Sequence, residues 1–342
     1  MFTKTNRASA ATTPSASRRS FRLSRASVAA IAALAAGTAT VGFTALSAQP
    51  ASAATAGTPV NCAAAPSSCG YPDASNAGVP AGTTLKTVPG QVSSGPGWHY
   101  DAASEVVQVD GAGATLTGLY IPYGVNIKAN NVTLTDDKIV TGGASAIAVS
   151  LRHTAGVTIS HDTIAGIDAG ANRMMTGVKD VYGDSTGMTI AADDISRFET
   201  GVQLETGMIR DNYIHDPGYI TGDHTNGVMS NGGTAPLTIT HNTIFNNRSQ
   251  TDAIALFEDF GTQANRTVTG NLLAGGSYTI YGGATKPALP TSNITITGNR
   301  IATTYYPAGG SAGPAAYFDS AGTGNTWTGN IWDNTGQAIP AP

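Results

Sequence analysis

The chain has 342 residues, of which 42 are glycine and 12% are charged, and its formal net charge is −4. A chain with so few charges and a small acidic excess has no large basic field, which excludes nucleic acid as a partner. The length permits a sizeable core, and the recurrent Thr, Asn, Gly, Ile and Val residues favour strands and turns over helices.

Residues 1–53 have the pattern of a secretory signal. The basic stretch Arg18-Arg19-Ser20-Phe21-Arg22 precedes an Ala-rich apolar run at 28–36, and Ala51-Ser52-Ala53 supplies small residues for cleavage. Paired arginines before a Phe resemble the twin-arginine type, and an ordinary signal with a basic front end is the alternative. Because the apolar run is too interrupted to span a membrane, we expect a secreted protein with no membrane attachment after cleavage.

The two cysteines, Cys62 and Cys69, closely follow the predicted cleavage site. Outside the cell this spacing favours a disulfide over a metal site, because no His or third Cys is near them in the sequence. The surrounding stretch 54–96 is rich in Pro, Gly, Ser and Ala. That composition indicates a linker or an irregular N-terminal cap.

From about residue 110 onward, a pattern of apolar and Asn/Asp positions recurs roughly every 20 to 30 residues. Two columns of this repeat are apolar almost throughout, as core-facing positions of stacked strands must be. The first runs Leu134, Ile159, Ile190, Ile209, Ile239, Val268, Ile296, Trp327, and the second Ile139, Ile164, Ile195, Ile214, Ile244, Leu273, Ile301, Trp332. Between them runs a column of short polar residues: Asp137, Asp162, Asp193, Asn212, Asn242, Asn271, Asn299 and Asn330.

Such a polar column is typical of a tight turn whose residues tolerate left-handed backbone and bond to nearby main chain. A second short strand follows each copy, and no helical periodicity is present, which predicts a parallel β-helix. The repeat [VI]-T-[IL]-x-x-[ND]-x-I resembles the right-handed parallel β-helix superfamily of secreted carbohydrate-active proteins, which includes pectate lyases, polygalacturonases and alginate lyases. The resemblance implies one all-β domain of about nine coils over residues 97–342. We expect a monomer that acts on polysaccharide.

The second strand of each repeat provides a candidate substrate face. If Ile147, Val178, Val202, Val228, Ile254 and Ile280 point inward, the residues that follow them point outward. Neighbouring coils lie about 4.8 Å apart, so one continuous strip is expected to carry Lys179, Gln203, Glu205, Asn231, Phe257 and Tyr281. Charged, amide and aromatic side chains together suit a sugar chain. The alternative is a merely solvated sheet face.

The densest group of functional side chains lies in the loop 215–226, with His215, Asp223, His224 and Asn226. Histidine is the commonest general base near neutral pH, and a carboxylate can fix its tautomer. Asp-His-x-Asn-Gly-Val before a strand resembles a motif of β-helix carbohydrate enzymes, whereas the Gly-His-Gly and Arg-Ile-Lys elements of polygalacturonases are missing. Alternatively, His224 and Asn226 only cap a turn and His215 is simply exposed.

Other candidates have thinner support. Arg173 could neutralise a uronate carboxylate, although most surface arginines have no role in substrate binding. Asp259 lies two coils beyond Glu205, roughly 10 Å away, which is near the upper limit for an inverting carboxylate pair. No zinc spacing is present. Calcium is the one cofactor that acidic groups of this kind could hold, although no calcium-loop motif is present.

Three functions follow from these residues. A uronate lyase would use Lys179, Asn231 or Arg173 to neutralise the substrate carboxylate, His215, His224 or Lys179 as base, and Tyr281 as acid. A glycoside hydrolase would use Glu205, Asp223 or Asp259 as its acid–base pair. A non-catalytic carbohydrate-binding or cell-surface protein would need no such chemistry.

Overall fold

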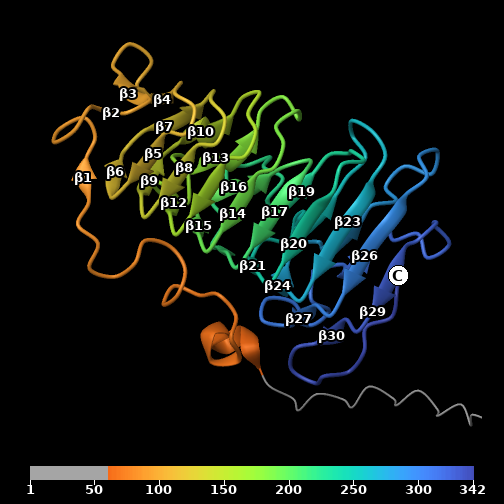
Figure 1. Ribbon diagram of the computed structural model, residues 1–342. Helices are drawn as coiled ribbons and strands as arrows, with labels where there is room; N and C mark the ends of the chain where they lie inside the picture. Colours follow the sequence, from red (N-terminus) through yellow and green to blue (C-terminus); the bar gives the residue numbers. More distant parts are fainter. Residues whose placement is uncertain (1–60) are drawn as a thin grey trace, which may run out of the picture. The chain divides into compact units, whose positions relative to one another are not determined.

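Each repeat of the sequence folds into three short strands, and equivalent strands of successive repeats pair in parallel (Figure 1). The computed structural model describes residues 61–342, so the signal sequence predicted at 1–53 lies outside the described residues. The predicted class, an all-β right-handed parallel β-helix, is confirmed. Within residues 61–342 no helix has the length and apolar character needed to cross a membrane.

The strands form three sheets, which we name A, B and C. Sheet A contains β1 (Lys86–Thr87), β6 (Leu119–Ile121), β9 (Lys138–Thr141), β12 (Thr163–Gly166), β15 (Asp194–Ser196), β18 (Tyr213–His215), β21 (Thr243–Asn246), β24 (Leu272–Gly275), β27 (Arg300–Ala302) and β30 (Ile331–Trp332). Sheet B contains β2 (Ser94–Gly95), β3 (Trp98–Asp101), β4 (Val106–Val109), β7 (Gly124–Ile127), β10 (Gly143–Leu151), β13 (Met174–Asp180), β16 (Phe198–Gln203), β19 (Asn226–Ser230), β22 (Asp252–Leu256), β25 (Tyr278–Gly282) and β28 (Gly313–Ala316). Sheet C contains β5 (Thr115–Thr117), β8 (Thr133–Thr135), β11 (Thr158–Ser160), β14 (Thr189–Ala191), β17 (Gly207–Arg210), β20 (Leu237–Thr240), β23 (Ala264–Thr269), β26 (Ser292–Thr297) and β29 (Thr326–Thr328).

The solenoid has about seven turns, slightly fewer than the roughly nine coils predicted. The first and last copies of the repeat form the terminal strands β5 and β29, which pair with a neighbour on one side only. The two apolar columns fill the interior as predicted. Ile159, for example, pairs with Leu134 and Ile190 in sheet C, and all three are fully buried.

The Asn/Asp column forms a continuous hydrogen-bonded ladder between sheets C and A. The backbone N–H of each member donates to the side-chain oxygen of the next, from Asp137 N to Asp162 Oδ1 at 2.6 Å through to Asn299 N to Asn330 Oδ1 at 3.1 Å. The left-handed backbone predicted for this column falls one residue earlier instead, for example at His161 and His241, with φ of 58° and 53°. The ladder side chains are therefore free to turn inward and bond along the stack.

The two halves of the ladder differ chemically. In the Asn half, each amide nitrogen donates to a carbonyl of the turn below, as Asn212 Nδ2 does to Ile190 O at 3.0 Å. In the Asp half, the corresponding oxygens, Oδ2 of Asp137, Asp162 and Asp193, are buried and have no hydrogen-bond partner among the residues that the structure describes. Burial raises the pKa of Asp137 to about 7 and the pKa values of the other two well above the usual range. Protonated carboxyls would carry a hydrogen where Asn carries its amide hydrogens.

This ladder predicts that the fold loses stability as the pH rises. A carboxyl with a raised folded-state pKa stabilises the fold below its unfolded pKa near 3.9, and this contribution is lost as the pH rises through about 7. Asp137→Asn should therefore raise the free energy of unfolding at pH 8 by a few kcal/mol, with little change at pH 4. Urea denaturation at both pH values measures this, with exposed Asp110→Asn as the control. Equal gains at pH 4 and pH 8 would contradict the account.

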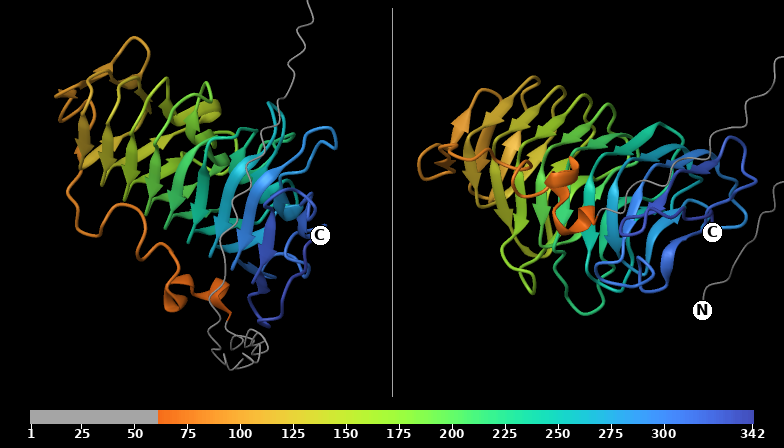
Figure 2. Two further views of the ribbon diagram at one scale, coloured as in Figure 1. Left: turned by 45° about the vertical axis from the view of Figure 1, so that its right-hand side comes forward. Right: turned by 90° about the horizontal axis from the view of Figure 1, so that it is seen from below.

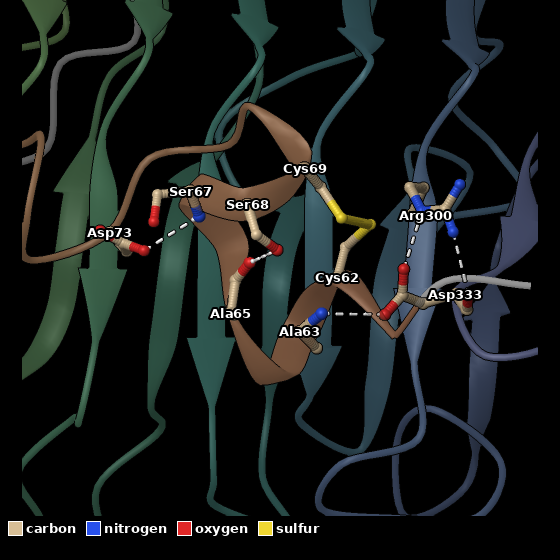
Figure 3. Close-up of a disulfide and its surroundings, with 9 residues drawn as sticks. All are labelled: Cys62, Ala63, Ala65, Ser67, Ser68, Cys69, Asp73, Arg300 and Asp333. Atoms are coloured by element: carbon tan, nitrogen blue, oxygen red, sulfur yellow. Dashed lines mark hydrogen bonds and ion pairs between the residues drawn. A yellow bond between two sulfur atoms is a disulfide. The ribbon is translucent and has the colours of Figure 1, made fainter.

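Residues 61–85, predicted as part of a linker or N-terminal cap, run along the outer face of sheet A (Figure 2). The segment is anchored at several turns: Ala63 N donates to Asp333 Oδ2 at 2.9 Å, Tyr71 stacks on His241, and Gly78 N donates to Ala192 O at 2.8 Å. Cys62 and Cys69 form a disulfide next to the hydrogen bond between Ala63 and Asp333 (Figure 3). Sheet A is thus covered by this segment, and the outer face of sheet B is not.

Candidate functional site

The outer face of sheet B carries the residue column predicted as a substrate strip. Val178, Val202, Val228, Ile254 and Ile280 are register partners and fully buried. The next residues, Lys179, Gln203, Met229, Ala255 and Tyr281, are likewise register partners. The predicted alignment was wrong in one coil, because Val149 and not Ile147 pairs with Val178. The register of β10 shifts between Gly143 and Ile147, which a one-sequence alignment could not place.

A hollow of about 280 Å³ opens on this face, lined by His224, Asn226, Met229, Thr251, Phe257 and Asp259. We call it the histidine hollow. It brings together four of the predicted site residues from two neighbouring turns. The imidazole of His224 is exposed, and Nε2 of Gln250 lies 3.4 Å from its Nδ1. That separation is long for a hydrogen bond. Because an amide nitrogen only donates, the contact favours the tautomer whose Nδ1 is unprotonated.

The loop that carries His224 is held by a buried ion pair. Arg173 donates from Nε to Asp223 Oδ2 at 2.6 Å and from Nη2 to both Asp223 Oδ1 at 2.5 Å and Glu199 Oε2 at 2.9 Å. Burial alone would raise the pKa of Asp223, but the hydrogen bonds from Arg173 and from the Ile220 N–H outweigh it and lower that pKa. Arg173 and Asp223 therefore engage one another and fix the position of the residue that follows, His224.

Sequence reasoning missed Arg248 in the equivalent loop one turn further on. Its guanidinium lies 5.6 Å from the ring centroid of Tyr219, and its Nη2 donates to Pro217 O at 3.3 Å. Its buried Nε has no hydrogen-bond partner among the described residues. Arg248 and Gln250 line a small hollow beside His224. The signal in the sequence was an arginine in the loop between β21 and β22, which is the equivalent, one turn later, of the loop that carries His224.

A second missed residue, Asp252, lies beside the histidine hollow. It pairs with Asn226 in the sheet register and is fully buried, and neither of its carboxyl oxygens has a hydrogen-bond partner within residues 61–342. Burial raises its pKa well above the usual range. Oδ1 of Asn226 is also buried without a partner in this part of the chain. The sequence signal was a carboxyl in a column where the preceding turns carry Thr176, Thr200 and Asn226.

Aromatic side chains continue the face beyond the histidine hollow. The ring of Phe257 lies 5.3 Å from that of Tyr281, and Tyr281 stacks on Tyr317 at 5.5 Å. Burial raises the pKa of Tyr281, so its phenol stays protonated at neutral pH. Tyr281 therefore lies next to Phe257, which lines the histidine hollow.

A second hollow of about 480 Å³ is lined by Asp180, Val181, Tyr182, Gly183, Gln203, Glu205, Gly232 and Phe260. We call it the aromatic hollow. The Glu205 carboxylate accepts hydrogen bonds from Ser230 Oγ at 2.7 Å and from the N–H groups of Asn231 and Gly232. Predicted residues Gln203 and Glu205 thus lie here, with Asn231 buried beside them. Glu205 and Asp259, considered as a carboxylate pair, line different hollows.

Two predicted catalytic residues lie apart from the histidine hollow. His215 ends β18 in sheet A, where its ring nitrogens are each 2.9 Å from a carboxylate, of Asp194 and of Asp216. Burial opposes the charge on His215, but these two bonds outweigh it and raise the pKa to about 9. Lys179 is on the correct face, but four coil spacings, roughly 19 Å, separate it from Tyr281. These residues do not form one centre.

Across residues 61–342, no group of three or more His, Cys, Asp or Glu side chains is arranged to hold a metal ion. No protein-family model matches the sequence, and no curated protein matches it. The fold is compatible with carbohydrate-active and with cell-surface proteins. The arrangement of side chains on sheet B is therefore the basis for any functional assignment.

Proposed function

We propose that this protein is a secreted polysaccharide lyase that binds its substrate on sheet B and cleaves it at the histidine hollow. The observation that carries the proposal is the convergence of His224, Asn226 and Phe257 in one hollow, with Tyr281 against Phe257. Export is supported by the signal pattern of residues 1–53.

β-Elimination at a uronate requires three groups. Arg248, which lines the small hollow beside His224, would pair with the substrate carboxylate, because a guanidinium binds a carboxylate bidentately. His224 would remove the proton at C5, and the electron pair would form the C4–C5 double bond as the C4–O bond breaks. Tyr281 would protonate the departing oxygen. His224 directly precedes β19, and Tyr281 is in β25. These two strands are two coil spacings apart, roughly 10 Å.

A glycoside hydrolase is the second candidate. Asp259 lines the same hollow, and burial raises the pKa of the Asp252 carboxyl beside it. Two carboxyl groups in contrasting environments are the arrangement that acid–base hydrolysis uses. Asp252 is fully buried, however, and so does not reach into the hollow. Elimination is therefore the better supported reaction.

The test is digestion of a panel of polysaccharides, with and without calcium, followed by ultraviolet absorbance and by a reducing-end assay. We expect both signals to rise together, because elimination creates an unsaturated uronate and a new reducing end. Reducing ends without absorbance would replace the lyase by a hydrolase. Retention in a polysaccharide gel without either product would replace it by a binding protein.

A further inference from the structure

The aromatic hollow adjoins the histidine hollow on the same sheet face. Gln203 lines the first, Met229 lines the second, and the two are register partners in β16 and β19. One coil spacing, about 4.8 Å, therefore separates the floors of the two hollows. A linear polymer seated in one can continue into the other.

Two exposed aromatic side chains line this hollow. Phe260 is 85% exposed and Tyr182 is 54% exposed, which is unusual for large apolar rings. The ring of Tyr182 is held in place, because it stacks on His153 and its hydroxyl accepts from Arg152 Nη1 at 3.2 Å. The backbone of Phe260 is anchored by its N–H, which donates to Asn231 O at 2.8 Å. Exposed rings of this kind offer flat apolar surfaces to a ligand.

The polar lining of the aromatic hollow consists of hydrogen-bond acceptors and an amide. Asp180 accepts from the N–H and hydroxyl of Ser185 at 3.0 Å, and Glu205 accepts from Ser230 and two backbone N–H groups. Among the described residues, no Lys or Arg lines this hollow. Arg266 lies behind Glu205, where its guanidinium donates to carbonyl oxygens including Glu205 O at 3.0 Å. An anionic sugar would meet the Glu205 carboxylate here, next to the buried Asp180, whereas a neutral sugar could donate hydroxyl hydrogens to Glu205.

We propose that the aromatic hollow binds a neutral sugar residue, so that the substrate is a heteropolymer of uronate and neutral sugars. This inference rests on the binding face of the proposed function, and it names the substrate class for that face. The neutral residue lies against Phe260 and Tyr182 with its hydroxyls toward Gln203 and Glu205. The uronate lies in the histidine hollow near Arg248. A polymer of uronate alone would place a carboxylate against Glu205.

Affinity electrophoresis tests this inference separately from catalysis. Wild type, Phe260→Ala and the control Ile167→Ala would be run in gels that contain alternating uronate and neutral sugar (hyaluronan, rhamnogalacturonan) or uronate alone (polygalacturonate, alginate). Ile167 is exposed and lines neither hollow. We expect at least one heteropolymer to bind about tenfold more tightly than either homopolymer. Phe260→Ala should lose most of that tenfold preference, because it removes the more exposed of the two rings, and Ile167→Ala should keep it.

The outcomes separate the two proposals. Equal binding of heteropolymers and homopolymers, or a Phe260→Ala variant that keeps the preference, would overturn the neutral-sugar site. A preference that depends on Phe260, without any unsaturated product, would support this site while removing the elimination reaction. Binding of no polymer at all would overturn both.

Discussion

Replacing His224 with alanine is expected to lower kcat/KM on the cleaved polysaccharide by about 10²- to 10⁴-fold, the range for loss of a general base. Its side chain is exposed and makes one long contact, to Gln250. The thermal midpoint should therefore stay within a few degrees of the wild-type value. Initial rates of absorbance gain, with a melting curve for each variant, measure both quantities.

The matched control for this variant is His99→Ala. His99 is an exposed histidine in the β3 hairpin strand and lines neither hollow. Its replacement should leave the rate unchanged. A His224→Ala variant with the wild-type rate would show that His224 only shapes the loop, and the proposed base would have to be sought elsewhere.

Replacing Arg173 with methionine is expected to lower the free energy of unfolding by about 3 to 5 kcal/mol, the cost of removing one partner from a buried ion pair. The guanidinium is almost completely buried and bonds both Asp223 and Glu199. Without it, two carboxylates face one another in a partly dry environment. Urea denaturation at pH 7 measures the change. Cleavage should also fall, because the pair positions the loop that carries His224.

The exposed pair of Arg210 and Asp211 provides the control for this prediction. Exposed ion pairs contribute roughly 0 to 1 kcal/mol, so Arg210→Met should change stability little. The double variant Arg173→Met, Asp223→Leu should recover part of the loss, because it removes one of the orphaned charges. A loss below about 1 kcal/mol for Arg173→Met would mean that the ion pair does not hold the loop.

The fold could be predicted from the sequence because burial repeats with the coil. Residues such as Leu134, Ile159 and Ile190 occupy the same inward position in successive turns, so each supports the assignment of its neighbours. The Asn/Asp column, which forms the ladder, supported the same alignment of turns independently of the apolar columns. The strip on sheet B followed from period-two alternation. It failed at Ile147, where two extra residues in β10 shift the register, and at Asn231, which is buried.

The functional centre was less predictable, because loops of unequal length decide which side chains meet. His215 and His224 are close in sequence, but one ends a sheet A strand and the other precedes a sheet B strand. Arg248 and Asp252 come from the next turn and were not singled out, since nothing in one sequence aligns their loop with that of His224. The pairing of Arg173 with Asp223, 50 residues apart, likewise depends on how the loops fold back.

The central claim, that sheet B is the polysaccharide face, is tested most directly by hydrogen–deuterium exchange of His224→Ala with a bound oligosaccharide. The ligand would be prepared from a polymer that retards the protein in affinity gels. We expect slower exchange in the segments that line the two hollows, 180–183, 203–205, 224–232 and 250–260, and unchanged exchange in sheet C. Protection confined to sheet C, with those four segments unaffected, would contradict the account.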